Sequence, residues 1–488
     1  MTKLKICVAS AEVAPFAKTG GLADVAAGLT RFLSSAGHDA RLFVPLYGRV
    51  RRGNWDLRPA LDGNLCVRSG GRDWIFSIYS AALPQSSEQV YFLDCGELFD
   101  RDAIYTAEDD ALRFGLYTRA CLEVCQRSRW APDVFHCNDW HTGLLPLYLK
   151  TLYRWDRLFE HSRTLLTVHN IGYQGNFADG VLAALGLEGE KGNLHDSDIG
   201  TGRVGFLKTG LLHSDLLTTV SETYAAEIQG GELGMGLEGL LRRRSDALFG
   251  IVNGVDYGEW DPSGDELIAA TYSARDLSGK ARCKQALMHQ VNLPWDPDVP
   301  VFGVISRLTA QKGFELFPDI LPVLLQEHDL RLVVLGSGEE RYESYFQWLR
   351  DTYSEKVSIY RGYNNELAHR IEAGSDVFCM PSRYEPCGLN QMYSLRYGTV
   401  PLVRRTGGLA DTVADWDPGS RRGTGFVFDE FRSEALLACM RRALATWTDQ
   451  GAWTELVRNG MAQDWSWDVQ GPRYVDLYTR LAASSMVR

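Results

Sequence analysis

Short apolar runs alternate with longer stretches of helical period along the whole chain. The first run covers residues 6–10, and apolar side chains then recur at helical spacing up to residue 33. Further strand-like runs cover residues 40–45, 132–136, 164–168 and 216–221 in the first half, and residues 301–306, 330–335, 357–360 and 377–381 in the second. This alternation predicts an α/β fold built from doubly wound parallel sheets.

The length of the chain predicts two domains, because 488 residues exceed what one hydrophobic core normally organises. The second set of strands starts after an irregular stretch that follows residues 249–256. We therefore expect a Rossmann-like N-terminal domain over residues 1–248 and a second one over residues 249–471, facing each other across a deep cleft. The helical segment 472–488 could pack back on the first domain.

Two glycine-rich junctions of nearly the same sequence each follow a strand and open a helix, at residues 18–25 and 406–413. The paired glycines are Gly20 and Gly21 in the first junction and Gly407 and Gly408 in the echo. Glycine lets the backbone approach a ligand, and a helix N-terminus favours an anion. A plain strand-to-helix turn would also need glycine. The repetition suggests two α/β domains that each aim the start of a helix at a shared cleft, with Lys18 adding positive charge to the first junction.

Polar residues stand where two neighbouring strands of the first half end. Asp139 follows the run 132–136, and His169 with Asn170 follows the run 164–168. Ligands of open α/β sheets gather at the carboxyl ends of strands, so these side chains are placed for chemistry. The alternative for Asp139 is that it only caps the following helix, and a lone histidine at a strand end is often structural.

A rigid turn in the second half, residues 382–390, carries the densest functional signal. Pro386 fixes one backbone angle and Gly388 admits an unusual one, so the Glu385 carboxylate and the amides of Gly388 and Leu389 are held in place. The carboxylate can accept hydrogen bonds from sugar hydroxyls, and the amides can meet phosphate. Cys387 in this turn has no basic partner beside it in sequence, so we assign it to packing.

Three cations suit a diphosphate leaving group, whose charge grows in the transition state. Arg307 and Lys312 lie on a loop that enters a helix of the second half, and Lys18 lies in the first. Metal-dependent sugar transferases usually place an Asp-x-Asp pair at a strand end. The pairs at residues 100–102 and 296–298 stand in loop contexts, so we expect no metal.

Composition and charge exclude several classes of protein. The chain is 45% hydrophobic and 23% charged, as in ordinary globular proteins, and its net charge of −11 argues against a general affinity for nucleic acid. It has no apolar run long enough to cross a membrane. The N-terminus runs directly into the first strand, which predicts a cytoplasmic protein. Its 10 cysteines include no C-x-x-C pair and should remain reduced.

These motifs together resemble those of bacterial glycogen synthases and plant starch synthases, which are retaining glucosyltransferases of the GT-B fold. The resemblance spans nearly the whole chain. It is carried in family order by residues 18–25, 138–141, 168–170, 252–256, 306–313, 385–389 and 406–413. Cys137 and Asn138, just before Asp139, look more like the plant form of the motif, so a plastid location would apply if this were a mature plant-type chain.

The resemblance implies roles for individual residues. Lys18, Arg307 and Lys312 would meet the nucleotide phosphates. His169 and Glu385 would contact the donor glucose, and Asp139 the reacting sugar or the acceptor. It further implies nucleotide contacts from Gly20, Gly21, Asn253, Tyr363, Gly388, Leu389, Thr406, Gly407 and Gly408, with Tyr363 against the nucleobase.

The reaction implied by the resemblance is transfer of glucose from ADP-glucose to the 4-hydroxyl at the non-reducing end of an α-1,4-glucan, with retention of configuration. ADP-glucose and the glucan would be the partners, with no further cofactor. A hydrolase could also use two carboxylates such as Asp139 and Glu385, but a cationic set is superfluous for a neutral glycoside. We favour a front-face route in which the leaving phosphate helps to deprotonate the acceptor.

Two other functions stay open at this point. One is a UDP-glucose-dependent transferase with a small acceptor, of the sucrose or trehalose synthase type. The other is a non-catalytic glucan-binding protein that keeps the fold, against which stands the joint presence of Lys18, Asp139, Arg307, Lys312 and Glu385. A phosphorylase would need a lysine that holds pyridoxal phosphate, and we identify no such motif. The oligomeric state is left undetermined.

Overall fold

The computed structural model describes residues 3–84, 86 and 88–484, which divide into two compact units. Unit 1 comprises residues 1–254 with 467–488, and unit 2 comprises residues 255–466. The first boundary lies six residues beyond the predicted residue 248 (254 − 248), because Leu248–Gly250 forms a last strand, β12, on the sheet of unit 1. The second lies before residue 467, so the whole C-terminal helix belongs to unit 1.

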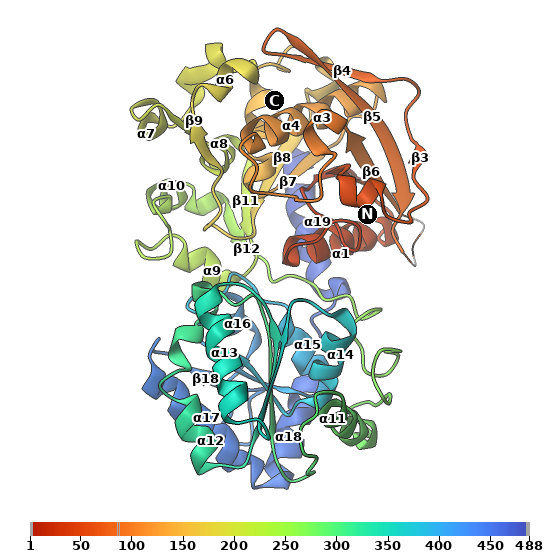
Figure 1. The fold of residues 1–488 in the computed structure, drawn as a ribbon. Helices are drawn as coiled ribbons and strands as arrows, with labels where there is room; N and C mark the ends of the chain where they lie inside the picture. The colour runs from red at the N-terminus through yellow and green to blue at the C-terminus, as the bar shows by residue number, and fades with distance from the viewer. Residues whose placement is uncertain (1–2, 85, 87, 485–488) are drawn as a thin grey trace. The chain divides into compact units, whose positions relative to one another are not determined.

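Unit 1 is built on a 10-stranded sheet in the order β12-β11-β8-β7-β1-β2-β6-β5-β3, with β4 paired to β5 (Figure 1). The strands from β12 to β6 run parallel, and β5 pairs with β6 in an antiparallel hairpin. The bounds of the strands are β1 Lys5–Ala9, β2 Asp39–Pro45, β3 Arg58–Pro59, β4 Leu65–Ser69, β5 Arg72–Ala82, β6 Gln89–Asp94, β7 Val134–Asn138, β8 Arg163–Val168, β11 Leu216–Thr219 and β12 Leu248–Gly250, and β9 Asn176–Ala178 pairs with β10 Arg203–Gly205 apart from this sheet.

The helices of unit 1 cover this sheet. They are α1 Gly21–Ser35, α2 Gly48–Arg51, α3 Gly96–Phe99, α4 Asp110–Arg127, α5 Leu145–Lys150, α6 Val181–Ala184, α7 Asp196–Ile199, α8 Phe206–His213, α9 Glu222–Glu227, α10 Glu238–Arg243 and α19 Trp467–Ser484, with the 3-10 turns η1 Trp140–Thr142, η2 Arg157–Phe159, η3 Glu188–Asn193 and η4 Ser245–Ala247. The central strand β7 is buried along its whole length and β8 is buried from Thr164 to Val168, as expected for a parallel sheet covered on both faces.

The C-terminal helix α19 packs beside α1, far from it in sequence (Figure 1). Gly471 allows the close approach, because a Cβ at this position would lie 2.2 Å from the Phe32 ring. The Tyr478 hydroxyl meets Nδ1 of the buried His136 on β7 at 2.8 Å. These contacts tie the last helix to the centre of the first sheet.

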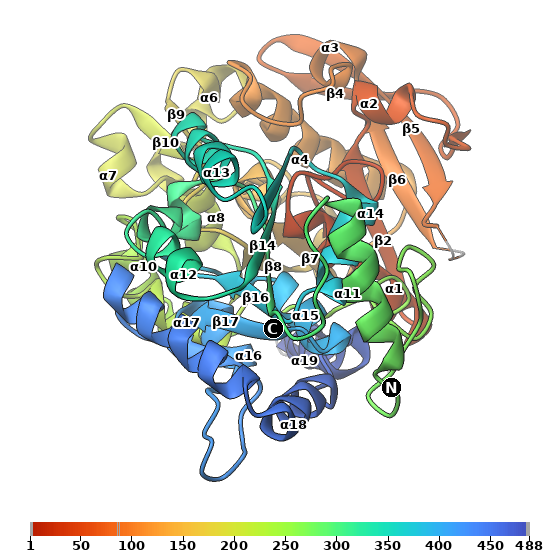
Figure 2. The same ribbon diagram turned by 60° about the horizontal axis from the view of Figure 1, so that its bottom comes forward.

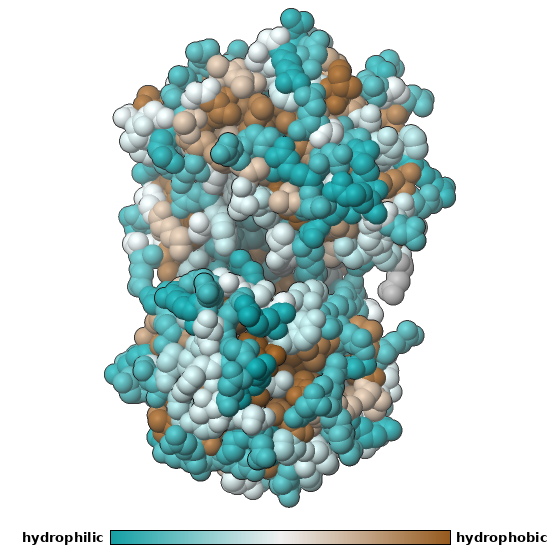
Figure 3. Space-filling model, viewed as in Figure 1, coloured by the Kyte–Doolittle hydropathy of each residue, from teal (hydrophilic) through white to brown (hydrophobic). Residues whose placement is uncertain are grey.

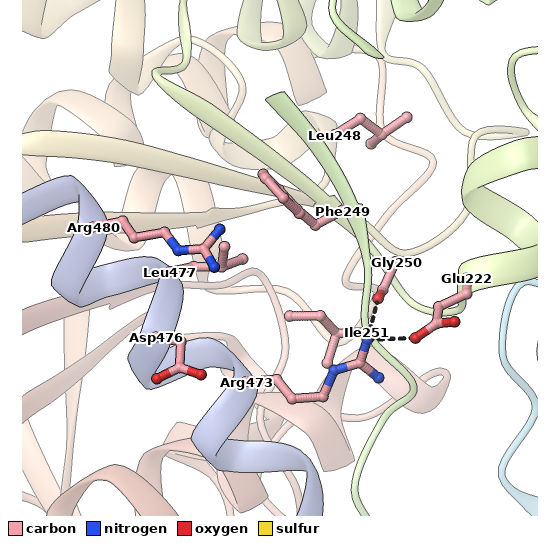
Figure 4. Close-up of a pocket in the computed structure, with 9 residues that line it drawn as sticks. All are labelled: Glu222, Leu248, Phe249, Gly250, Ile251, Arg473, Asp476, Leu477 and Arg480. Carbon is pink, nitrogen blue, oxygen red and sulfur yellow. Dashed lines mark hydrogen bonds and ion pairs between the residues drawn. The ribbon is translucent and has the colours of Figure 1, made fainter. Parts of the chain in front are cut away.

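A pocket of about 390 Å³ lies between α19 and the edge strand β12. Figure 4 shows Arg473 reaching from α19 to this strand, where it donates to the Gly250 carbonyl at 3.1 Å and pairs with Glu222. Arg480 and Asp476 line the same pocket from α19. The Arg473 contacts hold the helix to the edge of the sheet. Positive and negative side chains balance in the lining, so the pocket presents no net charge to a ligand.

Unit 2 holds a 6-stranded, fully parallel sheet in the order β15-β14-β13-β16-β17-β18. Its strands are β13 Val301–Ile305, β14 Arg331–Gly336, β15 Val357–Arg361, β16 Val377–Met380, β17 Val400–Arg404 and β18 Phe426–Phe428. Its helices are α11 Ser278–Gln290, α12 Leu321–Glu327, α13 Glu340–Thr352, α14 Asn365–Gly374, α15 Asn390–Tyr397, α16 Gly407–Thr412, α17 Ser433–Trp447 and α18 Gln450–Met461, with 3-10 turns η5 Ala310–Lys312 and η6 Phe314–Leu316.

Helices cover both faces of the second sheet. Figures 1 and 2 both show α12 and α13 on one side of the second sheet, with α11 and α14 on the other. The predicted α/β class and the predicted strands are therefore confirmed in both units. None of the helices in the described part of the chain is both long and apolar enough to cross a bilayer.

The surface is mainly hydrophilic, with brown patches interspersed on the face that Figure 3 presents. Large hydrophobic side chains that remain exposed include Trp155, Tyr173, Trp348 and Tyr363. Such scattered side chains are ordinary for a globular protein.

Candidate active site

The two sheets share a strand arrangement that creates a place for a ligand. In each unit the strand order reverses beside the first strand, between β1 and β7 in unit 1 and between β13 and β16 in unit 2. Loops that leave the carboxyl ends of such neighbours diverge to opposite faces of the sheet and open a crevice. The glycine loop and Asp139 follow β1 and β7, whereas Arg307 and the turn with Glu385 follow β13 and β16. The sequence candidates thus lie at the two switch points.

Asp139 does not cap the helix that follows it. It stands at the start of η1, but its side chain makes no capping hydrogen bond. One oxygen, Oδ1, instead accepts the backbone N–H of His169 at 2.7 Å. Its φ of 56° is in a region that non-glycine residues rarely adopt, and such strain concentrates at functional sites. The capping alternative for this residue is therefore excluded.

Burial raises the pKa of the Asp139 carboxyl from 3.8 to about 7. The backbone N–H groups of His169 and Asn170 favour the charged form but only partly oppose this effect. A carboxyl group whose pKa lies near neutrality can exchange a proton at physiological pH. Such a group is suited to steps in which a hydroxyl gains or loses a proton.

His169 is a neutral imidazole in this structure. Burial lowers its pKa to about 3, and its Nε2 lies 2.8 Å from Oδ1 of Asn138. The ring therefore carries no positive charge at pH 7, so it would contact a sugar by hydrogen bonding and not as an ion.

The glycine loop of unit 1 is held by Glu12, a residue that the sequence reasoning missed. The buried Glu12 carboxylate accepts the Thr19 amide at 2.5 Å and the Gly20 amide at 3.2 Å through Oε2, and the Tyr105 hydroxyl at 2.5 Å through Oε1. The available signal was an acidic residue between a buried strand and a glycine loop, where a carboxylate is well placed to accept loop amides. Lys18 on this loop is exposed and pairs with Asp24 at 2.7 Å.

In unit 2 the structure brings Lys312 and Glu385 together. Lys312 Nζ lies 2.5 Å from Oε2 of Glu385, and the Ser382 hydroxyl donates to the same oxygen at 3.0 Å. The side chains keep only 18% and 7% of their surface exposed, so they form a largely buried ion pair. Arg307, at the end of the neighbouring β13, is exposed. A cation, a carboxylate and a second cation thus stand at one switch point.

The two glycine junctions differ, contrary to what their similar sequences predict. A Cβ at Gly20 would meet nothing within 4 Å, so that loop is open to an approaching group. A Cβ at Gly407, where φ is 44°, would lie 1.9 Å from the Glu385 carbonyl oxygen, and the Gly408 N–H donates to that carbonyl at 3.2 Å. The second pair of glycines therefore also serves to pack α16 against the Glu385 turn.

The remaining candidates lie in varied surroundings. Gly21 is exposed and is the first residue of α1, and Thr406 is buried just before α16. Leu389 directly precedes α15, and Gly388 in the turn has a φ of 72°. Tyr363 follows β15 and is 67% exposed, so its ring is accessible for stacking against a nucleobase. The Asn253 side chain is buried, and its Oδ1 has no partner in the described part of the chain. Cys387 is buried and forms no disulfide, in agreement with a packing role.

Comparisons with known proteins identify the family of the chain. A family model described as the starch synthase catalytic domain matches residues 5–243, and one described as glycosyl transferases group 1 matches residues 289–459. The glycogen synthase of Koribacter versatilis (strain Ellin345) is 44% identical over 482 residues, covering 98% of both chains. That of Myxococcus xanthus (strain DK1622) is 44% identical over 486 residues, covering 98% of this chain and all of the relative.

Solved structures give the same result. The catalytic domain of starch synthase IV from Arabidopsis thaliana, solved with ADP and acarbose bound, superposes with a TM-score of 0.92 at 33% identity, covering 99% of this chain and 100% of that one. A sucrose-phosphate synthase from Thermosynechococcus elongatus, at 17% identity and a TM-score of 0.60, shares the fold alone.

Two parallel α/β units with polar strand ends at each switch point define a GT-B glycosyltransferase. The chain belongs to the family of glycogen and starch synthases, and it is a glucosyltransferase of glycogen or starch synthesis.

Proposed function

We propose that the enzyme transfers glucose from ADP-glucose to the 4-hydroxyl at the non-reducing end of an α-1,4-glucan, with retention of configuration. The observation that carries the proposal is the Lys312–Glu385 ion pair, with Arg307 nearby in the sequence at the switch point of unit 2. A related starch synthase of nearly the same fold has ADP and acarbose, an oligosaccharide analogue, bound. A nucleoside diphosphate and a glucan are therefore the ligands that we assign.

The cations have a defined part in this proposal. As the bond between glucose and the diphosphate breaks, negative charge grows on the leaving oxygen, and Arg307 and Lys312 stabilise it more in the transition state than in the ground state. Lys18 on the open glycine loop supplies a third positive charge. Lys312 would then exchange part of its contact with Glu385 for the phosphate, which frees the Glu385 carboxylate to accept hydrogen bonds from sugar hydroxyls.

The way in which the configuration is retained depends on whether Asp139 or Glu385 acts as a covalent nucleophile. Neither Asp139 nor Glu385 is offered as a covalent nucleophile, since Glu385 is assigned to the sugar hydroxyls and Asp139 binds the His169 amide. We infer a front-face reaction in which the departing phosphate accepts the proton of the attacking hydroxyl. His169, as a neutral ring, would orient the donor glucose.

We further propose that the reaction needs neither a metal nor a cofactor, because the three cations can meet the diphosphate charge. The Asp-x-Asp pairs are engaged elsewhere. Asp100 and Asp102 both pair with Arg52, and Asp296 accepts the backbone N–H of Asp298. Activity should survive treatment with a chelator. We place the enzyme in the cytoplasm by analogy with its bacterial relatives.

The test is a radiolabel transfer assay with ADP-glucose or UDP-glucose as donor, and glycogen or free sugars as acceptor. We expect label in glycogen from ADP-glucose, and its release by an enzyme that cleaves α-1,4 linkages. An Arg307→Ala variant serves as the site control, and Arg441→Ala, which removes an exposed ion pair on α17, as the surface control. Transfer to free glucose or fructose phosphate in place of glycogen would contradict the proposal.

A further inference from the structure

The amide group of Asn138 can take only one orientation. Asn138 ends β7 and is 2% exposed. One end of the amide lies 3.0 Å from the Ala9 carbonyl oxygen and 3.4 Å from the His136 carbonyl oxygen. Both neighbours are acceptors, so this end must be the NH₂ donor group; the reverse orientation would set three oxygens against one another. The backbone of two neighbouring strands thus fixes the Asn138 Oδ1 as the atom that faces His169.

This orientation determines which nitrogen of His169 carries the proton. His169 Nε2 lies 2.8 Å from Asn138 Oδ1, which can only accept, so Nε2 must bear the hydrogen. The other nitrogen, Nδ1, has no hydrogen-bond partner among the described residues, and the residue keeps 9% of its surface accessible. The backbone of His169 is held in addition by Asp139. Asn138 therefore holds the ring of His169, and the next residue, Asp139, holds its backbone.

We propose that Asn138 is a positioning residue that holds His169 in the tautomer with its proton on Nε2, so that Nδ1 accepts a hydrogen bond from a hydroxyl of the donor sugar. The inference rests on the proposed contact between His169 and the donor. It adds a direction to that contact, because the sugar donates and the protein accepts. The low pKa of His169 supports it, since an imidazolium would have no lone pair to offer.

Nuclear magnetic resonance of the protein labelled with ¹⁵N in its histidines tests the tautomer directly. The chain has 10 histidines, and a His169→Gln variant identifies the signals of His169. We expect Nε2 to show the shift of a protonated ring nitrogen and Nδ1 that of an unprotonated one. In an Asn138→Leu variant the proton should redistribute between the two nitrogens. A protonated Nδ1 in the unmodified protein would overturn the inference.

Kinetics test whether Asn138 acts through His169. Loss of one such hydrogen bond should lower kcat/KM of Asn138→Leu about tenfold. The same change in a His169→Ala background should lower it by less than about twofold, because the ring that Asn138 orients is then absent. Equal losses in both backgrounds would assign Asn138 to packing and contradict the proposal. Asn138→Asp serves as a second variant, which keeps the acceptor for Nε2–H but loses the donor to the carbonyls.

A matched control is available in unit 2. The Asn459 amide on α18 also donates to two backbone carbonyls, those of Arg421 and Gly423, both at 3.2 Å. Asn459→Leu should lose a comparable local contact and leave activity unchanged. Thermal melting of all variants shows whether each one folds.

Donor analogues that lack one hydroxyl each identify the sugar group. One analogue should be transferred about tenfold less efficiently by the unmodified enzyme and show no additional loss with His169→Ala. The outcomes separate this inference from the proposed function. Absence of transfer from any nucleotide sugar would refute the function, whereas the resonance experiment needs no substrate and still reports the tautomer.

Discussion

Replacing Asp139 by asparagine should abolish activity and yet stabilise the enzyme at alkaline pH. The asparagine oxygen can still accept the His169 amide, which in the native chain donates at 2.7 Å to Oδ1. What the substitution removes is the ionisation of a buried carboxyl group whose pKa is raised to about 7 in the folded protein. The folded state holds the proton more tightly than the unfolded chain, so native stability falls as pH rises from about 4 to about 7.

The magnitude follows from the two pKa values. The shift from 3.8 to about 7 amounts to about 3 units, hence about 4 kcal/mol of lost stability once the pH exceeds both values. The stability gained by Asp139→Asn should therefore be about 3 kcal/mol greater at about pH 8.5 than at about pH 5. For a unit of this size that difference corresponds to a shift in melting temperature on the order of 10 °C.

The assay is thermal and urea unfolding of both proteins across this pH range, followed by circular dichroism and by fluorescence. Glu12 lies near enough to raise the Asp139 pKa further by its charge, so a Glu12→Gln variant should show a smaller pH effect. A stability difference that is constant with pH, or that grows toward acid pH, would refute the reasoning. Turnover of the unmodified enzyme is expected to change through about pH 7 if Asp139 acts in its ionised form.

Four further substitutions probe the site. Arg307→Ala and Lys312→Ala should each lower kcat by about 10²-fold or more at saturating donor, measured as initial rates of label transfer, and near-normal turnover would disprove the assignment to the leaving group. Lys312→Ala should also lower the melting temperature, because it leaves the carboxylate of its partner in the ion pair buried alone. Cys387→Ala should be tolerated with a modest loss, and mass spectrometry should find no glucosyl adduct on this sulfur in the unmodified enzyme. Glu12→Gln should raise the KM for the donor, since one amide oxygen cannot accept the Thr19 amide, the Thr19 hydroxyl and the Gly20 amide that the carboxylate accepts, and an unchanged KM would show that the loop holds without Glu12.

The local features of the protein were determined by its sequence. Alternating apolar runs and helical periods predict each central strand, because a buried parallel strand is apolar along its whole length. Strand ends could also be identified, so Asp139, His169 and Glu385 became candidates from the residues that follow each run. The pairing of strands then brings such ends to one edge of a sheet, which is why a pattern local in sequence could indicate a candidate site.

Contacts between distant residues were decided by tertiary structure alone. Lys312 and Glu385 are 73 residues apart, and only the neighbouring positions of β13 and β16 make them an ion pair. The same holds for the raised pKa of Asp139, which arises from burial that no local pattern reports. The motif around Gly407 predicts a ligand loop, but it gives no sign of the close packing of this glycine against the Glu385 carbonyl. A sequence specifies which groups are present and their local geometry, whereas desolvation and pairing depend on which parts of the chain the fold brings into contact.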